Sequence, residues 1–220
     1  MKRTFILILF AVASLLFTFE IPKEKDSVHL LFKIIPLVLL LLMVWMRPNS
    51  HLKRWILAGL AFCMLGDAFI IFAFLPGLVF FLIGHLFYIG AFLTRKKEGL
   101  LPALSLLPIA IYGVYMGWKM VNALQQSEQS SLIIPVIIYI LAISLMGWAA
   151  IMTRNLYAAI GSLLFITSDS ILSWNLFVSS VNHAAVWIML TYYAAQGLIA
   201  CSIPAGKKEI YIRRTNYQIK

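Results

Sequence analysis

The chain has 220 residues, of which 62% are hydrophobic and 12% charged, and its mean hydropathy is +0.93. Soluble proteins carry roughly 25% charged residues, so this composition excludes a soluble domain and indicates one membrane domain. The net charge of +10 does not indicate a nucleic-acid partner, because the basic residues are spread over short segments between apolar runs.

The first half of the chain contains four long apolar runs. A helix needs about 20 apolar residues to cross the hydrocarbon core of a bilayer, and these runs predict helices at 4–19, 29–46, 53–75 and 77–94. Pro22 and the charged residues 23–26 end the first helix, and residues 47–49 end the second. Pro76-Gly77 predicts a tight hairpin between the third and fourth helices.

The second half continues the same pattern. Helices are predicted at 100–118, 131–151, 156–178 and 183–203, and residues 204–220 form a basic tail. The charged residues 95–99 separate the fourth helix from the fifth, and the polar run 125–131 precedes the sixth. The sequence therefore predicts an all-α polytopic membrane protein, with about eight transmembrane helices in one bundle.

The basic residues alternate between the two ends of these helices. Of the 18 Lys and Arg residues, 14 fall at the amino terminus, in alternate inter-helix segments or in the tail, and 3 fall in the opposite segments. Since cytoplasmic loops carry the excess of Lys and Arg, both termini are predicted to be cytoplasmic. The expected location is a membrane, the inner membrane if the source is bacterial.

The amino terminus allows a second interpretation. Lys2-Arg3 followed by an apolar run with Ala11-Val12-Ala13 resembles a secretory signal peptide. Cleavage after Ala13 would leave an apolar region of only about seven residues, at the lower limit for such signals. A retained first helix is the favoured interpretation.

Two of the eight acidic residues lie well inside predicted helices. Placing Asp67 or Asp169 at a helix centre costs at least about 2.5 kcal/mol, so such residues usually face the interior of a bundle and mark a functional site. The structural alternative is a carboxylate that joins two helices by hydrogen bonds. We interpret Asp67 and Asp169 as candidate catalytic groups.

Further polar residues lie on the same helices or their neighbours. His85 is the histidine well inside a predicted helix, and Tyr88, three residues later, shares its helical face. His85 is a third candidate catalytic residue, with a packing histidine as the alternative. Candidate substrate-binding residues are Lys33, which could also snorkel or form an ion pair, Tyr88, Asn175, Tyr192 and Gln196.

Other site chemistries find no support in the residue spacing. Cys63 and Cys201 lie in apolar runs without a CxxC partner, so neither a disulfide framework nor a zinc site is predicted. No HxxxH or ExxH spacing indicates a metal, and no GxSxG motif indicates a Ser–His–Asp triad. We expect neither a metal nor a cofactor.

Several short motifs occur in a fixed order along the chain. They are Leu65-Gly66-Asp67, Gly84 to Tyr88, Gly161 through Phe165 to Ser168-Asp169, and Tyr192 to Gln196. In order and spacing this set resembles the YhhN-like lysoplasmalogenase family. The resemblance extends from Lys33 to about residue 200 and implies an eight-helix membrane hydrolase. Its implied reaction is cleavage of the vinyl-ether bond of a lysoplasmalogen, a lysophospholipid, to a fatty aldehyde and glycerophospho-ethanolamine or -choline.

The candidate residues suit this chemistry. A vinyl ether hydrolyses by protonation at carbon, and water then captures the oxocarbenium ion, which calls for a general acid and a second carboxylate. One of Asp67 and Asp169 is expected to be the acid and the other to activate water, with His85 orienting groups or relaying protons. Tyr88, Tyr192 and Gln196 would position water or glycerol oxygens, and Lys33 would face the phosphate.

Two other functions use the same residues. A proton-coupled lipid or solute transporter would employ the carboxylates as proton relays and would release no aldehyde. A catalytically silent membrane scaffold would tolerate loss of both carboxylates.

Overall fold

The fold is known from a computed structural model, which describes residues 2–20 and 27–204. The first half contains α1 (Lys2–Phe19), α2 (Ser27–Trp45), α3 (His51–Phe69) and α4 (Phe74–Leu93). The second half contains α5 (Leu100–Leu104), α6 (Leu106–Gln126), the 3-10 turn η1 (Ser130–Leu132), α7 (Ile133–Met152), α8 (Leu156–Ser173), the π-helical turn η2 (Trp174–Val178) and α9 (Ala184–Cys201). The described residues contain no strand, which confirms the all-α prediction.

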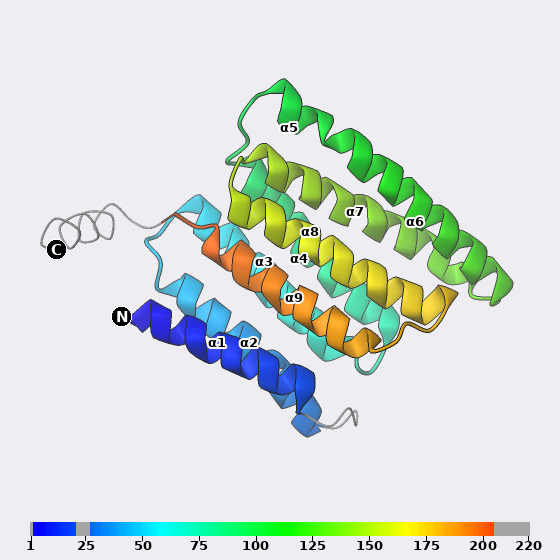
Figure 1. Ribbon diagram of the computed structural model, residues 1–220, viewed down its shortest axis with the longest axis horizontal. Coiled ribbons are helices and arrows are strands. Elements are labelled where there is room, and N and C mark those ends of the chain that lie inside the picture. The colour runs from blue at the N-terminus through cyan, green and yellow to red at the C-terminus, as the bar shows by residue number, and fades with distance from the viewer. Residues whose placement is uncertain (1, 21–26, 205–220) are drawn as a thin grey trace, which may run out of the picture.

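The long helices lie side by side in one bundle (Figure 1). The helices α3, α4, α7, α8 and α9 form its middle, and α1 with α2 packs along one edge against α3 and α9. At the other edge α6 packs mainly on α7. The site described below lies in the middle of the bundle and along its boundary with α6.

The composition of the helices identifies an integral, multi-pass membrane protein. Among the described residues, six helical segments are long and apolar enough to cross a membrane; they begin at Val28, Phe74, Pro102, Ser130, Leu156 and Ala184. The apolar part of α1, Arg3–Phe19, is shorter than these, and α3 carries Lys53, Arg54 and Asp67. The count of eight crossing helices stays a prediction.

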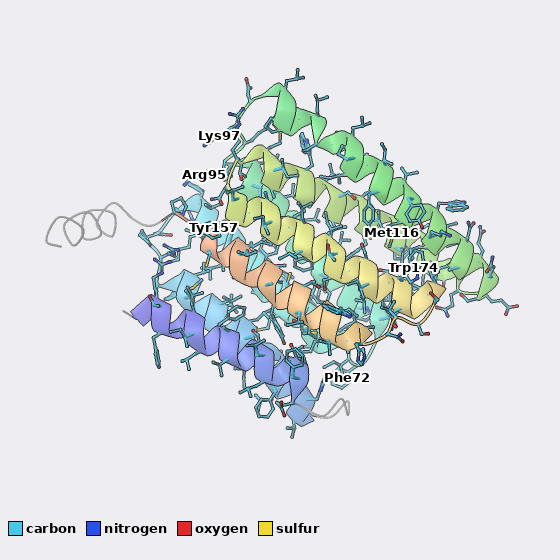
Figure 2. All side chains as sticks on the ribbon, in the orientation of Figure 1. Phe72, Arg95, Lys97, Met116, Tyr157 and Trp174 are labelled. Atoms are coloured by element: carbon cyan, nitrogen blue, oxygen red, sulfur yellow. The ribbon has the colours of Figure 1, made fainter. Side chains whose placement is uncertain are left out.

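The basic segments gather at one end of the bundle. The amino terminus, the connections that follow α2, α4 and α7, and the end of α9 all lie at the left of Figure 1, and Arg95 and Lys97 are labelled there in Figure 2. Arg154 Nη2 donates to the Glu98 carbonyl at 2.9 Å, which joins two of these connections. Lys23, Lys25 and the tail beyond residue 204 lie outside the described part of the chain.

The predicted hairpin at Pro76-Gly77 is wrong. The turn lies at residues 70–73, and Pro76 and Gly77 belong to the first turn of α4. A proline is tolerated in the first helical turn, because its missing N–H would have no partner within the helix there. The structure therefore ends α3 six residues before the predicted boundary at residue 75 and begins α4 at Phe74.

The predicted helix at 100–118 differs in a similar way. A break at Ser105 separates the short α5 from α6, and α6 runs on to Gln126. Pro108 removes the N–H that would bond to the Leu104 carbonyl in a continuous helix, and the Ser105 hydroxyl donates to the Pro102 carbonyl at 2.6 Å. Lys119 therefore lies inside a helix and not in a loop.

Candidate active site

Asp67 is the centre of a buried polar network between α2, α3 and α9. The residue is 2% exposed, and its two carboxylate oxygens have different partners. Lys33 Nζ on α2 lies 3.1 Å from Oδ1, and the hydroxyl of Tyr192 on α9 donates to Oδ2 at 2.6 Å. Lys33 Nζ also donates to the Asp67 backbone carbonyl at 3.3 Å. A buried carboxylate and a buried ammonium thus satisfy each other.

The same network reaches α1 through Tyr193. The Tyr193 hydroxyl donates to the backbone carbonyl of Lys33 at 2.9 Å. Its ring meets the edges of Phe10 and Phe17 on α1, at centroid distances of 6.4 and 6.1 Å. These contacts hold α1, α2 and α9 together at the depth of the ion pair, so Lys33 is positioned from three helices.

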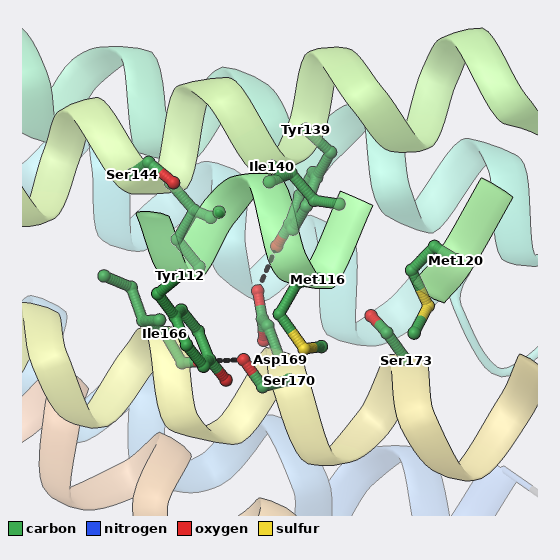
Figure 3. Close-up of a pocket in the computed structure, with 12 residues that line it drawn as sticks. Tyr112, Met116, Met120, Tyr139, Ile140, Ser144, Ile166, Asp169, Ser170 and Ser173 are labelled. Carbon is green, nitrogen blue, oxygen red and sulfur yellow. Dashed lines mark hydrogen bonds between the residues drawn. The ribbon is translucent and has the colours of Figure 1, made fainter. Parts of the chain in front are cut away.

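Asp169 lies in a second, separate polar group. The hydroxyl of Tyr139 on α7 donates a hydrogen bond to Asp169 Oδ2 on α8, and Figure 3 shows the two side chains meeting between the helices. Asp169 is half-buried. No Lys or Arg side chain forms an ion pair with Asp169 within residues 2–20 and 27–204.

Asp169 and Tyr139 border a small cavity between α6, α7 and α8 (Figure 3). Its volume is about 30 Å³, and Met116, Met120 and Ser173 also line it. A water molecule needs roughly 10–15 Å³ of such space, so the cavity has room for about two. Asp67 and His85 do not line it.

His85 lies between the two carboxyl groups without a hydrogen bond to either. Its ring is fully buried and meets the edges of Tyr139 at 5.1 Å and of Phe165 at 4.6 Å between centroids. Phe165 in turn contacts the ring of Tyr192 at 5.4 Å. Both His85 nitrogens lack a hydrogen-bond partner among the described residues. Aromatic contacts therefore join the Asp67 network to the Asp169 group through His85.

The remaining predicted binding residues lie at two different locations. The Tyr88 hydroxyl donates to Gln196 Oε1 at 2.6 Å, so α4 and α9 are joined one turn from His85 and Tyr192. Asn175 lies in η2, and its Oδ1 accepts the Val181 N–H at 2.9 Å, which organises the turn before α9. The structure thus joins Lys33 and Tyr192 to Asp67 and pairs Tyr88 with Gln196 beside them. It leaves Asp169 in a separate group linked through aromatic rings, and Asn175 in a turn outside both.

Sequence reasoning missed three residues of this arrangement. Tyr139 lies 30 residues before Asp169, in a run of aliphatic residues that carries no motif. Phe165 and Tyr193 are ordinary members of apolar helices, although both stand inside segments that carry the family resemblance. A single sequence contains no signal for pairings between helices, because they depend on how the helices are rotated against each other.

The arrangement combines a hydrogen-bonded carboxyl group with room for water. A tyrosine and a carboxyl group border a cavity inside a low-dielectric bundle, and a neutralised Lys–Asp pair lies nearby. Such a site can donate and accept protons in acid–base chemistry. Among the described residues, no group of three or more His, Cys, Asp or Glu side chains is arranged to hold a metal ion.

These features define the class as a multi-pass membrane protein with polar residues buried between its helices. The YhhN family model matches residues 28–203, and the chain belongs to that family. It is 34% identical to a mouse protein named lysoplasmalogenase TMEM86B, over 86% of this chain and 81% of that one. The human protein of the same name is 34% identical, over 84% and 80%. No solved structure matches the chain.

Proposed function

We propose that this protein is a lysoplasmalogenase-type hydrolase, which cleaves the vinyl-ether bond of a lysoplasmalogen. The products are a fatty aldehyde and a glycerophospho-ethanolamine or -choline. The family and the relatives named lysoplasmalogenase support this reaction. The single structural observation that carries the mechanism is the Asp169–Tyr139 pair at a cavity with room for water.

Asp169 is the proposed proton donor. It borders the cavity and is half-buried, whereas Asp67 is almost completely covered and is engaged by Lys33 and Tyr192. The Asp169 carboxylic acid protonates the alkene carbon that is β to the ether oxygen, which turns the vinyl ether into an oxocarbenium ion. The resulting Asp169 carboxylate then accepts a proton from a cavity water as that water attacks the cation. The hemiacetal that forms collapses to the aldehyde and the glycerol hydroxyl.

The Asp67 network has a positioning and electrostatic role in this scheme. Its negative charge is balanced by Lys33 and does not have to be gained or lost during turnover. Tyr192, which donates a hydrogen bond to Asp67, packs against Phe165, and Phe165 packs against His85. The His85 ring in turn packs against the ring of Tyr139. Tyr139 in turn holds Asp169. The alkenyl chain stays in the surrounding bilayer, because the cavity has room for about two waters only.

An aldehyde-release assay tests the proposal. Purified protein in detergent, supplied with 1-alkenyl-lysophosphatidylethanolamine, is expected to release fatty aldehyde. Asp169→Asn removes the transferable proton and should lower kcat by about 10²–10⁴-fold. The matched control is Glu98→Gln, which removes a carboxyl group at the exposed basic end of the bundle and should leave kcat unchanged.

The acyl analogue separates this activity from general lipid hydrolysis. Lysophosphatidylethanolamine with an ester in place of the vinyl ether should yield no aldehyde. Full turnover by Asp169→Asn would contradict the assignment of the proton donor. Proton-coupled flux into proteoliposomes without any aldehyde would support a transporter instead.

A further inference from the structure

Lys119 lies away from the basic end of the bundle. Among residues 2–20 and 27–204, the Lys and Arg residues belong to the segments at the basic end of the bundle, with the exceptions of Lys33 and Lys119. The Lys33 ammonium is engaged by Asp67 in the buried ion pair. Lys119 is half-buried and forms no ion pair with a carboxylate of the described residues.

Aromatic rings of α6 and η2 surround the Lys119 ammonium. Its Nζ lies 5.1 Å from the ring centre of Trp118 and 5.9 Å from those of Tyr115 and Trp174. Trp174 belongs to η2, and its ring is held by a hydrogen bond from Nε1 to Ser179 Oγ at 2.9 Å. The ammonium therefore links α6 to η2, the turn that follows α8.

This place adjoins the cavity that Asp169 borders. Met116 and Met120, on either side of Lys119 in α6, line the cavity, and so does Ser173, the residue before Trp174. Figure 3 shows Met120 and Ser173 facing each other at one end of the cavity. In Figure 2, Met116 and Trp174 lie close together toward the end of the bundle opposite Arg95 and Lys97.

The distance along the helix axis between Asp169 and Trp174 matches the size of a lysophospholipid headgroup region. Trp174 follows Asp169 by five residues, a rise of about 7.5 Å along a helix. A lysophospholipid with its reacting bond at Asp169 carries its phosphate only a few covalent bonds away. Tryptophan and tyrosine also prefer the headgroup level of a bilayer, which is where the phosphate of a lipid resides.

We infer that Lys119, held by Trp118 and Trp174, binds the phosphate of the lysophospholipid substrate. This inference rests on the proposed hydrolase function and assigns its headgroup site. An ammonium beside a phosphate forms a charge-assisted hydrogen bond, and the aromatic rings keep the side chain from extending into water. Lys33 then serves the Asp67 network, and Lys119 selects lipids that carry a phosphate.

Direct binding measures this site without any turnover. The probe is a radiolabelled 1-O-alkyl-lysophosphatidylcholine, which has no vinyl ether to cleave, with the purified protein in neutral detergent. Lys119→Gln is expected to raise its Kd about tenfold. Lys119→Arg should bind nearly as the unmodified protein does, because a guanidinium also pairs with phosphate. The phosphate-free 1-O-alkylglycerol should bind all three proteins equally.

Lys96→Gln is the matched control, since Lys96 also lies over a tryptophan, Trp148, but at the basic end of the bundle. Its Kd should not change. An unchanged Kd in Lys119→Gln, or an equal loss of 1-O-alkylglycerol binding, would overturn the inference. Aldehyde release that is normal in Lys119→Gln at every substrate concentration would overturn it while leaving the hydrolase intact. Absence of aldehyde from every variant would instead count against the proposed function.

Discussion

At the residue scale, the buried charges of Lys33 and Asp67 depend on each other for stability. Lys33 is 8% exposed and Asp67 2%, and each supplies the other's counter-charge within the bundle. Removing one partner leaves a lone charge in a low-dielectric interior, which costs more than the pair itself contributes.

Lys33→Met is therefore expected to destabilise the protein strongly. The stranded Asp67 carboxylate should cost about 3–5 kcal/mol and lower Tm by roughly 10 °C. The double variant Lys33→Met with Asp67→Asn should regain part of this loss, because the amide keeps an acceptor for the Tyr192 hydroxyl. Thermal denaturation in detergent, followed by circular dichroism, measures both. An unchanged Tm in the single variant would show that the pair contributes nothing to stability.

At the scale of elements, close approach between α3 and α4 depends on Gly77. A Cβ atom at Gly77 would lie 2.7 Å from the Ile70 Cα and 2.8 Å from its backbone nitrogen. These are backbone atoms at the end of α3, so the turn itself would have to shift. Gly117 in α6 offers a contrast, because nothing lies within 4 Å of a Cβ placed there.

Gly77→Ala should accordingly lower stability by about 1–3 kcal/mol, the usual cost of an overpacked site. Gly117→Ala introduces the same methyl group without a clash and should leave Tm unchanged or slightly higher, since alanine favours helix over glycine. Thermal denaturation of the two variants in the same detergent gives the two Tm values to compare. Equal Tm values for both would contradict the tight turn at residues 70–73.

The whole molecule places its basic connections at one end of the bundle and its more neutral turns at the other. This polarity predicts an orientation in the membrane, because cytoplasmic segments retain positive charge. The aromatic setting of Lys119 and the cavity would then lie toward the outer side.

Cysteine labelling in intact cells tests that orientation. With Cys63 and Cys201 replaced by alanine, a membrane-impermeant maleimide should label Ser180→Cys directly, because residue 180 is exposed in the turn before α9. Lys97→Cys should react only after the cells are permeabilised. Labelling of both positions from outside would show that the charge distribution misidentifies the cytoplasmic end.

The sequence alone determined the class of protein and the residues that carry charge into the bundle. Composition required a membrane, since so few charges cannot cover so much apolar surface. Asp67, Asp169, His85 and Lys33 were found because a polar group among apolar residues is costly and therefore conspicuous. The helix boundaries near Pro76 and Pro108 were misplaced, because a proline marks either a break or the first turn of a helix, and only packing distinguishes them.

Tertiary structure decided which of these residues meet. Lys33 faces Asp67 across 34 positions of sequence, and Tyr192 reaches the same carboxylate across 125. No sequence motif marked Tyr139 or Lys119 as a site residue. Their positions near Asp169 follow from the packing of α6, α7 and α8. Helical periodicity tells which residues share a face of one helix, whereas the rotation of each helix against its neighbours depends on side-chain packing throughout the bundle.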